Sequence, residues 1–174
     1  MDRETALYMT LGAAVLFLIY SRTDEGSAVV AKMTDSVAST VRGIRNNNPG
    51  NIRRTSDAWQ GLSPVQPDSA FFTFESMPYG VRAMVVILKK YRGVYGLRTV
   101  RDIINRWAPP VENNTSAYVR YVADYVGTLP DTPLDFTSGD TLFYLVRAII
   151  AYEVGRVPAL LVSDADVREG MALA

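Results

Sequence analysis

The chain is organised around one stretch rich in turn-forming residues, Arg42-Gly-Ile-Arg-Asn-Asn-Asn-Pro-Gly-Asn-Ile-Arg-Arg54. A long regular helix is excluded here, because Asn tolerates left-handed backbone, Pro49 fixes one dihedral angle and Gly50 readily takes a positive φ. The interleaved amides and guanidinium groups offer many donors, so a ligand facing them should be rich in acceptors, as a sugar or a carboxylate is. We therefore interpret the stretch as the wall of a binding site, with an ordered connection between helices as the alternative. Its candidate substrate-binding residues are Arg45, Asn46, Asn48 and Asn51.

The composition excludes several kinds of chemistry. The 174 residues include neither Cys nor His, so a thiol nucleophile, a His-based triad and a thiolate or imidazole metal site are ruled out. General acid–base work would fall on Asp, Glu, Lys or Tyr, and we expect neither a metal nor an organic cofactor. The 18 Lys and Arg residues balance the 18 Asp and Glu residues, which gives no argument for nucleic acid as a partner.

An uncharged run between Glu4 and Arg22 predicts a membrane anchor over residues 1–22. The run is about the shortest that spans a bilayer as a helix, and Tyr8 and Tyr20 lie near its ends, as interfacial aromatic residues do. A cleaved signal peptide is disfavoured because the preceding residues are not clearly positive, and a buried core helix because the run has no polar face. We expect residues 5–21 to lie in a lipid membrane, that of a virion or the host inner membrane.

The rest of the chain predicts a tether followed by one mainly helical domain. Residues 23–41 are small and polar, as in a tether, and residues 42–174 form the domain. Apolar spacing and stop signals predict helices over 78–95, 100–107, 115–126 and 141–153, and a last short helix beginning at Ser163. Residues 70–74 are interpreted as a short strand or an extended segment against the core.

Glu153 is the candidate catalytic residue. It ends the most hydrophobic helix of the domain, so we expect its carboxyl to be partly desolvated. Desolvation favours the protonated form of a carboxyl, which a general acid needs at neutral pH. The alternative is a surface glutamate paired with Arg147 or Arg156. Four aromatic residues are candidates to stack on sugar rings: Trp59, Trp107, Tyr118 and Tyr121. Each is equally explicable as a core residue, and for Trp107 we favour the core.

The motifs, taken in order, resemble those of a family of phage and prophage proteins. They are the run from Arg42 to Ile52, Trp59-x-Gly61, Phe72-x-Phe74, Gly80-x-Arg82-Ala83 and Trp107-Ala-Pro-Pro-x-Glu112-Asn113-x-Thr115-x-x-Tyr118, and the resemblance extends to about Ala159. Members of that family are described as virion structural proteins or as lysozyme-like enzymes that degrade peptidoglycan. The resemblance implies a lysozyme-like helical fold with peptidoglycan as substrate. At the matched positions it implies Glu112 as a second carboxylate or substrate-binding residue, and Asn113 and Tyr118 as substrate-binding residues.

The segment Ala148-Ile-Ile-Ala-Tyr-Glu153-Val-Gly155 is similar to the catalytic segment of lytic transglycosylases and bacterial glucosaminidases, with Val154 in place of the usual serine. In glucosaminidases the glutamate helix precedes an Asn-x-Phe-Gly-Ile loop and a Trp-x-Gly motif. Here the glutamate helix follows Asn48-Pro-Gly-Asn-Ile52 and Trp59-Gln-Gly61. A circular permutation of the lysozyme-like fold would give this order.

These inferences predict a membrane-anchored phage enzyme that cleaves the glycan strands of peptidoglycan, as a lytic transglycosylase or a muramidase or glucosaminidase. The domain would face the periplasm and the cell wall. Glu153 would act as general acid and base, with Glu112 as a second carboxylate if the reaction needs one. The alternative is a non-catalytic minor virion membrane protein that links capsid and membrane and has other virion proteins as partners. A peptidase is disfavoured because the chain has no His or Cys.

Overall fold

A computed structural model describes residues 23–110 and 114–174. The chain divides into two units, Met1–Thr40 and Val41–Ala174. The described part of the first unit is one helix, α2 (Asp24–Thr40), whose first turn is capped by the Thr23 hydroxyl accepting a hydrogen bond from the backbone N–H of Gly26. Most of the segment predicted to be a tether is therefore helical.

The predicted transmembrane helix and membrane-anchored location are corrected by the structure. No helix formed by residues 23–110 and 114–174 is both long and apolar enough to cross a bilayer. The longest of these helices have 17 residues each and carry charged side chains, whereas a span needs about 20 predominantly apolar residues. The predicted span itself, residues 5–21, lies outside the described residues. What the structure supports of the predicted fold class is its mainly helical character.

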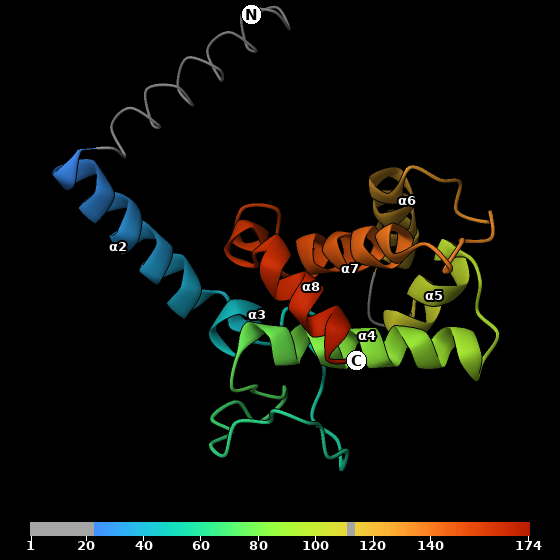
Figure 1. The fold of residues 1–174 in the computed structure, drawn as a ribbon, viewed down its shortest axis with the longest axis horizontal. Coiled ribbons are helices and arrows are strands. Elements are labelled where there is room, and N and C mark those ends of the chain that lie inside the picture. The colour runs from blue at the N-terminus through green and yellow to red at the C-terminus, as the bar shows by residue number, and fades with distance from the viewer. Residues whose placement is uncertain (1–22, 111–113) are drawn as a thin grey trace, which may run out of the picture. The chain divides into compact units, whose positions relative to one another are not determined.

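The second unit consists of helices of 4 to 17 residues (Figure 1). In chain order they are α3 (Arg42–Arg45), α4 (Met77–Gly93), α5 (Val100–Trp107), α6 (Thr115–Val126), α7 (Gly139–Val154), the 3-10 helix η1 (Pro158–Leu161) and α8 (Asp164–Ala172). The helices predicted from apolar spacing are all present, with ends that differ by a few residues at most.

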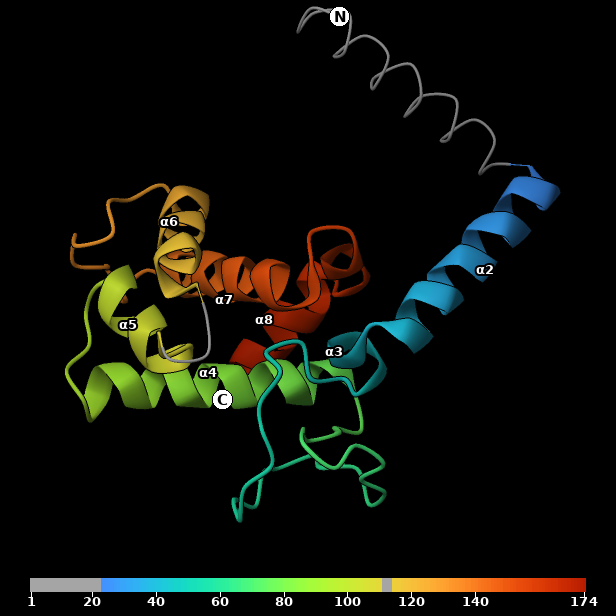
Figure 2. The ribbon, with the colours of Figure 1, turned by 180° about the vertical axis from the view of Figure 1, so that it is seen from behind.

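Helix α7 forms the centre of the core. It contacts α3, α4, α6, α8 and η1, and its residues Leu145, Val146, Ala148, Ile149 and Ile150 are completely buried. Helix α8 lies across α4 in both views (Figures 1 and 2), and Gly170 permits the close approach because a Cβ there would lie 2.7 Å from the Pro78 carbonyl oxygen. The long apolar run of α7 is thus explained by contacts on nearly every side.

The residues that begin and end the helices act locally. Thr99 and Asp102 form a capping box at the start of α5, and Ser163 and Asp166 form another at the start of α8. Helices α6 and α7 each end at a glycine with positive φ, which L-residues with a side chain rarely adopt.

Residues 46–76 form a long irregular excursion, the later part of which lies on the side of α4 away from α7 (Figure 1). The predicted strand is an extended segment with two isolated antiparallel bridges, Arg53 to Phe71 and Leu62 to Phe74. Phe72 and Phe74 are buried against Ala83 of α4, and together with partly buried Ile52, Trp59, Leu62 and Tyr79 they form a small second cluster. The excursion is therefore anchored to α4 by apolar contacts.

Gly80→Ala tests how closely this excursion packs on α4. A Cβ at Gly80 would lie 1.9 Å from the backbone carbonyl oxygen of Asn47, so the loop must move. We expect a loss of about 3 kcal/mol or more in the free energy of unfolding, measured by urea denaturation. Gly93→Ala on the same helix is the control, because a Cβ there meets no atom within 4 Å and the change should be neutral or slightly stabilising. Equal denaturation midpoints for the two variants would contradict the close contact.

Candidate functional site

The carboxylate of Glu153 is the point where four separate segments of the chain meet. Its Oε1 accepts hydrogen bonds from Trp107 Nε1 at 3.1 Å and from the Tyr118 hydroxyl at 3.0 Å. Its Oε2 accepts one from Asn51 Nδ2 at 3.1 Å. The four side chains come from the end of α7, the end of α5, the first half of α6 and the Asn-rich loop. Glu153 itself is half-buried.

Asn51 links the loop to the end of α7. Its amide also donates to the backbone carbonyl of Glu153 at 3.3 Å, one of the carbonyls that the end of a helix leaves without an intrahelical partner. Asn51 has a φ of 47°, a left-handed conformation that Asn tolerates better than most residues. Gly43 allows the approach, because a Cβ there would lie 2.6 Å from Val154 Cγ1 and 3.2 Å from Asn51 Oδ1.

Tyr118 is a fixed donor to the carboxylate. Its side chain is 1% exposed, and burial first, then the charge and hydrogen bond of Glu153, raise the pKa of its hydroxyl well above the ordinary value. The hydroxyl therefore stays protonated at neutral pH. The ring of Tyr152 stacks on that of Tyr118, with centroids 3.7 Å apart and planes 12° apart, which holds the donor in place.

The surface ion pair that was the alternative for Glu153 is not formed. Arg147 donates to the Val162 carbonyl and lies 3.5 Å from Asp164, measured from Nε to Oδ1. Arg156 lies over the ring of Tyr121 instead. The described donors to Glu153 are all neutral, so the group can exchange a proton without breaking an ion pair, as a general acid and base must.

Asn48 is a structural residue of the loop. It is completely buried, and its Nδ2 donates to the carbonyls of Ile52 at 2.9 Å and Phe72 at 2.8 Å. Its Oδ1 accepts from the backbone N–H of Ile52 at 2.9 Å. Because the amide is used inside the protein, Asn48 shapes the loop and has no group left for a ligand.

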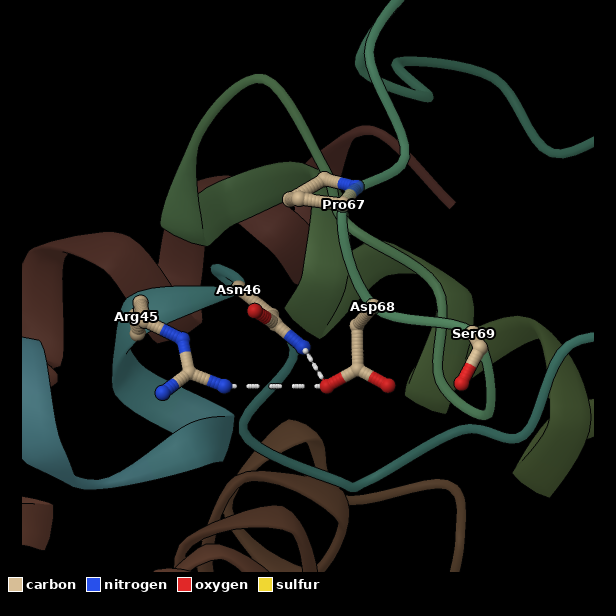
Figure 3. A pocket seen from close by; sticks show the side chains of 5 residues that line it. All are labelled: Arg45, Asn46, Pro67, Asp68 and Ser69. Atoms are coloured by element: carbon tan, nitrogen blue, oxygen red, sulfur yellow. Dashed lines mark hydrogen bonds and ion pairs between the residues drawn. The ribbon is translucent and has the colours of Figure 1, made fainter.

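Arg45 and Asn46 line a different part of the surface. With Pro67, Asp68 and Ser69 they border a hollow of about 360 Å³, and Glu153 is not among its lining residues (Figure 3). Asp68 Oδ2 accepts from Asn46 Nδ2 at 3.0 Å and lies 3.7 Å from a guanidinium nitrogen of Arg45. Asp68 was not predicted as a site residue. The feature of the sequence that could have indicated it is an acidic residue close to an arginine-rich loop. The donors of this part of the loop thus serve the protein's own carboxylate.

The remaining predicted site residues lie elsewhere or outside the described residues. Trp59 packs in the small cluster around Phe72 and Phe74, and its Nε1 is buried without a hydrogen-bond partner among the described residues. Glu112 and Asn113 lie outside the described residues. Trp107, expected in the core, is the contact with Glu153 that the sequence analysis missed. Within residues 23–110 and 114–174, no three acidic side chains gather as metal ligands would.

Comparison with known proteins connects the chain to bacteriophages. A scan of known protein families finds no match. The sequence is 36% identical over 132 residues to protein P5 of Pseudoalteromonas phage PM2, and the alignment covers 74% of this chain and 81% of that protein.

Tyr118→Phe tests the hydrogen bond to Glu153. Removing the hydroxyl deletes one of the donors to a half-buried carboxylate, so we expect the free energy of unfolding to fall by about 1–3 kcal/mol in urea denaturation. Tyr121→Phe, one turn further along α6, is the matched control, since its hydroxyl has no hydrogen-bond partner among the described residues. Equal stability of the two variants would show that the bond contributes nothing.

Asp68 predicts a pH dependence of stability. The pKa of its carboxyl is lowered from 3.8, first by hydrogen bonds from the backbone N–H of Ala70 and from the Asn46 side chain. The backbone N–H of Phe71 and the charge of Arg42 lower it further. A lowered folded-state pKa stabilises the fold above the unfolded value, and this contribution is lost as the pH falls through the folded value. The stability difference between the wild type and Asp68→Asn should therefore be full above about pH 5 and shrink below about pH 4.

The control is Asp124→Asn, at an exposed residue whose side chain has no hydrogen bond or ion pair with another described residue. Its stability difference from the wild type should stay near zero over the same pH range. A constant difference for Asp68→Asn would mean that its charge does not contribute.

Proposed function

The chain belongs to the family of phage protein P5, and from the geometry around Glu153 we propose that it cleaves the glycan strands of peptidoglycan, with Glu153 as general acid and base. The observation that carries the proposal is the convergence of Asn51, Trp107 and Tyr118 on one carboxyl group. These residues are far apart in the sequence, so the fold is arranged to hold this carboxyl in one orientation. Glycoside cleavage needs such a group to protonate the leaving oxygen and then to activate the attacking hydroxyl.

The proposed role of Glu153 needs no metal ion. The carboxyl would donate its proton to the glycosidic oxygen and take one back from water or from a hydroxyl of the sugar itself. Tyr118 and Trp107 fix one carboxylate oxygen, and Asn51 fixes the other. The charge that appears when the proton leaves is thereby stabilised by donors that are already in position.

A second candidate function is that of a non-catalytic virion protein whose partners are other virion proteins. It is favoured by the hydrogen bonds to both oxygens of Glu153, which would equally join α5, α6, α7 and the loop into one unit. In that case the carboxylate would serve as a structural centre. The two functions differ in whether the purified protein releases fragments from the cell wall.

The direct experiment is incubation of the full chain with purified peptidoglycan, followed by mass spectrometry of the released fragments. Anhydro-muropeptides would identify a lytic transglycosylase, and fragments with reducing ends would identify a hydrolase. Absence of release by folded protein would overturn the enzymatic proposal in favour of the virion protein.

Glu153→Gln is expected to abolish release, because an amide cannot donate a proton to the glycosidic oxygen. The variant should remain folded, with a loss of about 1–3 kcal/mol since one donor would face an amide N–H₂ group. Glu75→Gln is the matched control, being the same change at an exposed position. Release by Glu153→Gln at the wild-type rate would remove Glu153 from the proposed role.

A further inference from the structure

A second hollow of about 510 Å³ lies between α6, α7 and η1. Its walls include Tyr121, Asp124 and Tyr125 of α6, Arg147 of α7, and Arg156 and Leu160 beyond it. Its volume is within the roughly 300–1,000 Å³ of small-molecule sites, and it combines aromatic rings with a few polar groups, as such sites do. The binding site predicted from the sequence did not include this hollow.

A series of tyrosine rings leads from this hollow to Glu153. Tyr125 and Tyr121 have ring centroids 6.2 Å apart, Tyr121 and Tyr152 5.4 Å, and Tyr152 and Tyr118 3.7 Å. The hydroxyl of Tyr118 then donates to the Glu153 carboxylate. Tyr125 is 42% exposed and Tyr152 37% exposed, so parts of the series are open to solvent although Tyr118 is buried. We call Tyr125, Tyr121 and Tyr152 the tyrosine track.

One carboxylate and two guanidinium groups line the hollow, and not all of them are paired with another charged group. Arg147 is held by Asp164 and by the Val162 carbonyl. The Asp124 carboxylate has no hydrogen bond or ion pair with another described residue, and the Arg156 side chain has only the contact of its guanidinium with the Tyr121 ring, 5.2 Å from the centroid. One carboxylate and one guanidinium thus border the same hollow and keep their hydrogen-bonding capacity for a ligand.

These features select the chemistry of the ligand. A strongly charged ligand would leave either Asp124 or Arg156 repelled or unused, whereas a neutral ligand with many hydroxyl groups can use both. Exposed tyrosine rings offer flat apolar faces for the C–H faces of pyranose rings. We propose that the tyrosine track binds a strand of β-linked N-acetylated sugars and leads it toward Glu153. This inference rests on the proposed glycan cleavage and names the surface that would bind the strand.

Binding of a β-1,4-linked N-acetylglucosamine tetramer to the full chain tests the track, with isothermal titration calorimetry as the readout. Tyr125→Ala should raise the Kd by roughly five- to tenfold, because one stacking ring is lost. Asp124→Asn should raise it by about tenfold, because a charged acceptor becomes neutral. Since the exposed Asp124 carboxylate has no hydrogen bond or ion pair with another described residue, we expect its substitution to leave the fold intact and to keep the test valid if Tyr125→Ala proves unstable.

Tyr95→Ala is the matched control, because Tyr95 is 43% exposed and belongs to the segment after α4. It should bind the tetramer as the wild type does. Wild-type affinity of both Tyr125→Ala and Asp124→Asn, or no binding by the wild type, would overturn the track.

Cleavage assays on the same variants separate the track from the proposed function. Glu153→Gln should bind the tetramer like the wild type while releasing no fragments from peptidoglycan. Binding that depends on Tyr125 and Asp124 without any cleavage by the wild type would retain the track as a sugar-binding surface and overturn the catalytic role. Cleavage by a wild type whose Tyr125→Ala and Asp124→Asn variants bind normally would retain the enzyme and overturn the track.

Discussion

The buried amide of Asn48 is the interaction on which the rest of the site depends. It holds both ends of its own turn and the Phe72 segment, using two donors and one acceptor in a place with no access to water. Without it, the Phe72 carbonyl would lack its bond, and an unpaired buried polar group costs about 1–3 kcal/mol. The turn that it fixes is also the one that directs Asn51, in its left-handed conformation, toward the end of α7. An apparently local bond thus sets the geometry of a contact between residues 102 positions apart in the chain.

Glu153 occupies an electrostatically unfavourable place. The C-terminal end of a helix carries a partial negative charge, so an acidic residue in the last turn of α7 is destabilising there by about 0.3–1 kcal/mol. Half-burial removes part of its hydration as well. The donors from Asn51, Trp107 and Tyr118 offset these costs. A glutamine would fill the same space without the charge but would turn an N–H₂ group toward one of these donors, so the donors themselves favour an acid at this position.

Sequence patterns predicted the features that depend on neighbouring residues, such as helix ends. They did not predict the features that depend on which side chains are buried in the fold. The helices followed from apolar spacing and from stops such as Gly127 and Gly155, which act over a single turn. Glu153, Asn51 and Tyr118 were singled out separately, from an apolar helix ending in an acid and from an ordered set of motifs, whereas the hydrogen bonds that join them are seen only in the fold. Asn48 and Asn51 have the same side chain within one loop, and only the fold shows that one faces inward and the other faces Glu153.

Two predictions, the place of Trp107 and the membrane anchor, rested on the apolar character of the residues. Trp107 was assigned to the core because an apolar ring gives no sign of where its single N–H points; in the fold that N–H meets Glu153. The membrane anchor was inferred from an uncharged run with tyrosines near its two ends, and the described helices contain no segment that could serve as one. Hydropathy and residue type indicate whether a side chain favours an apolar or a polar environment. Which residue it contacts is determined by the packing of segments that are far apart in the sequence.

The unequal hydrogen bonding of the two Glu153 oxygens assigns them different parts in the proposed reaction. A carboxylate offers about four acceptor positions. Oε1 accepts from both Trp107 and Tyr118, so its positions are filled, whereas Oε2 accepts only from Asn51 among the described residues. The proton to be transferred would therefore sit on Oε2, on the side of the Asn-rich loop. Protonation there keeps all of the donors in place, because each of them bonds to a lone pair that the proton does not need. The hydrogen bonds that appear to make Glu153 a structural residue are thus compatible with acid–base work, provided that the sugar approaches Oε2.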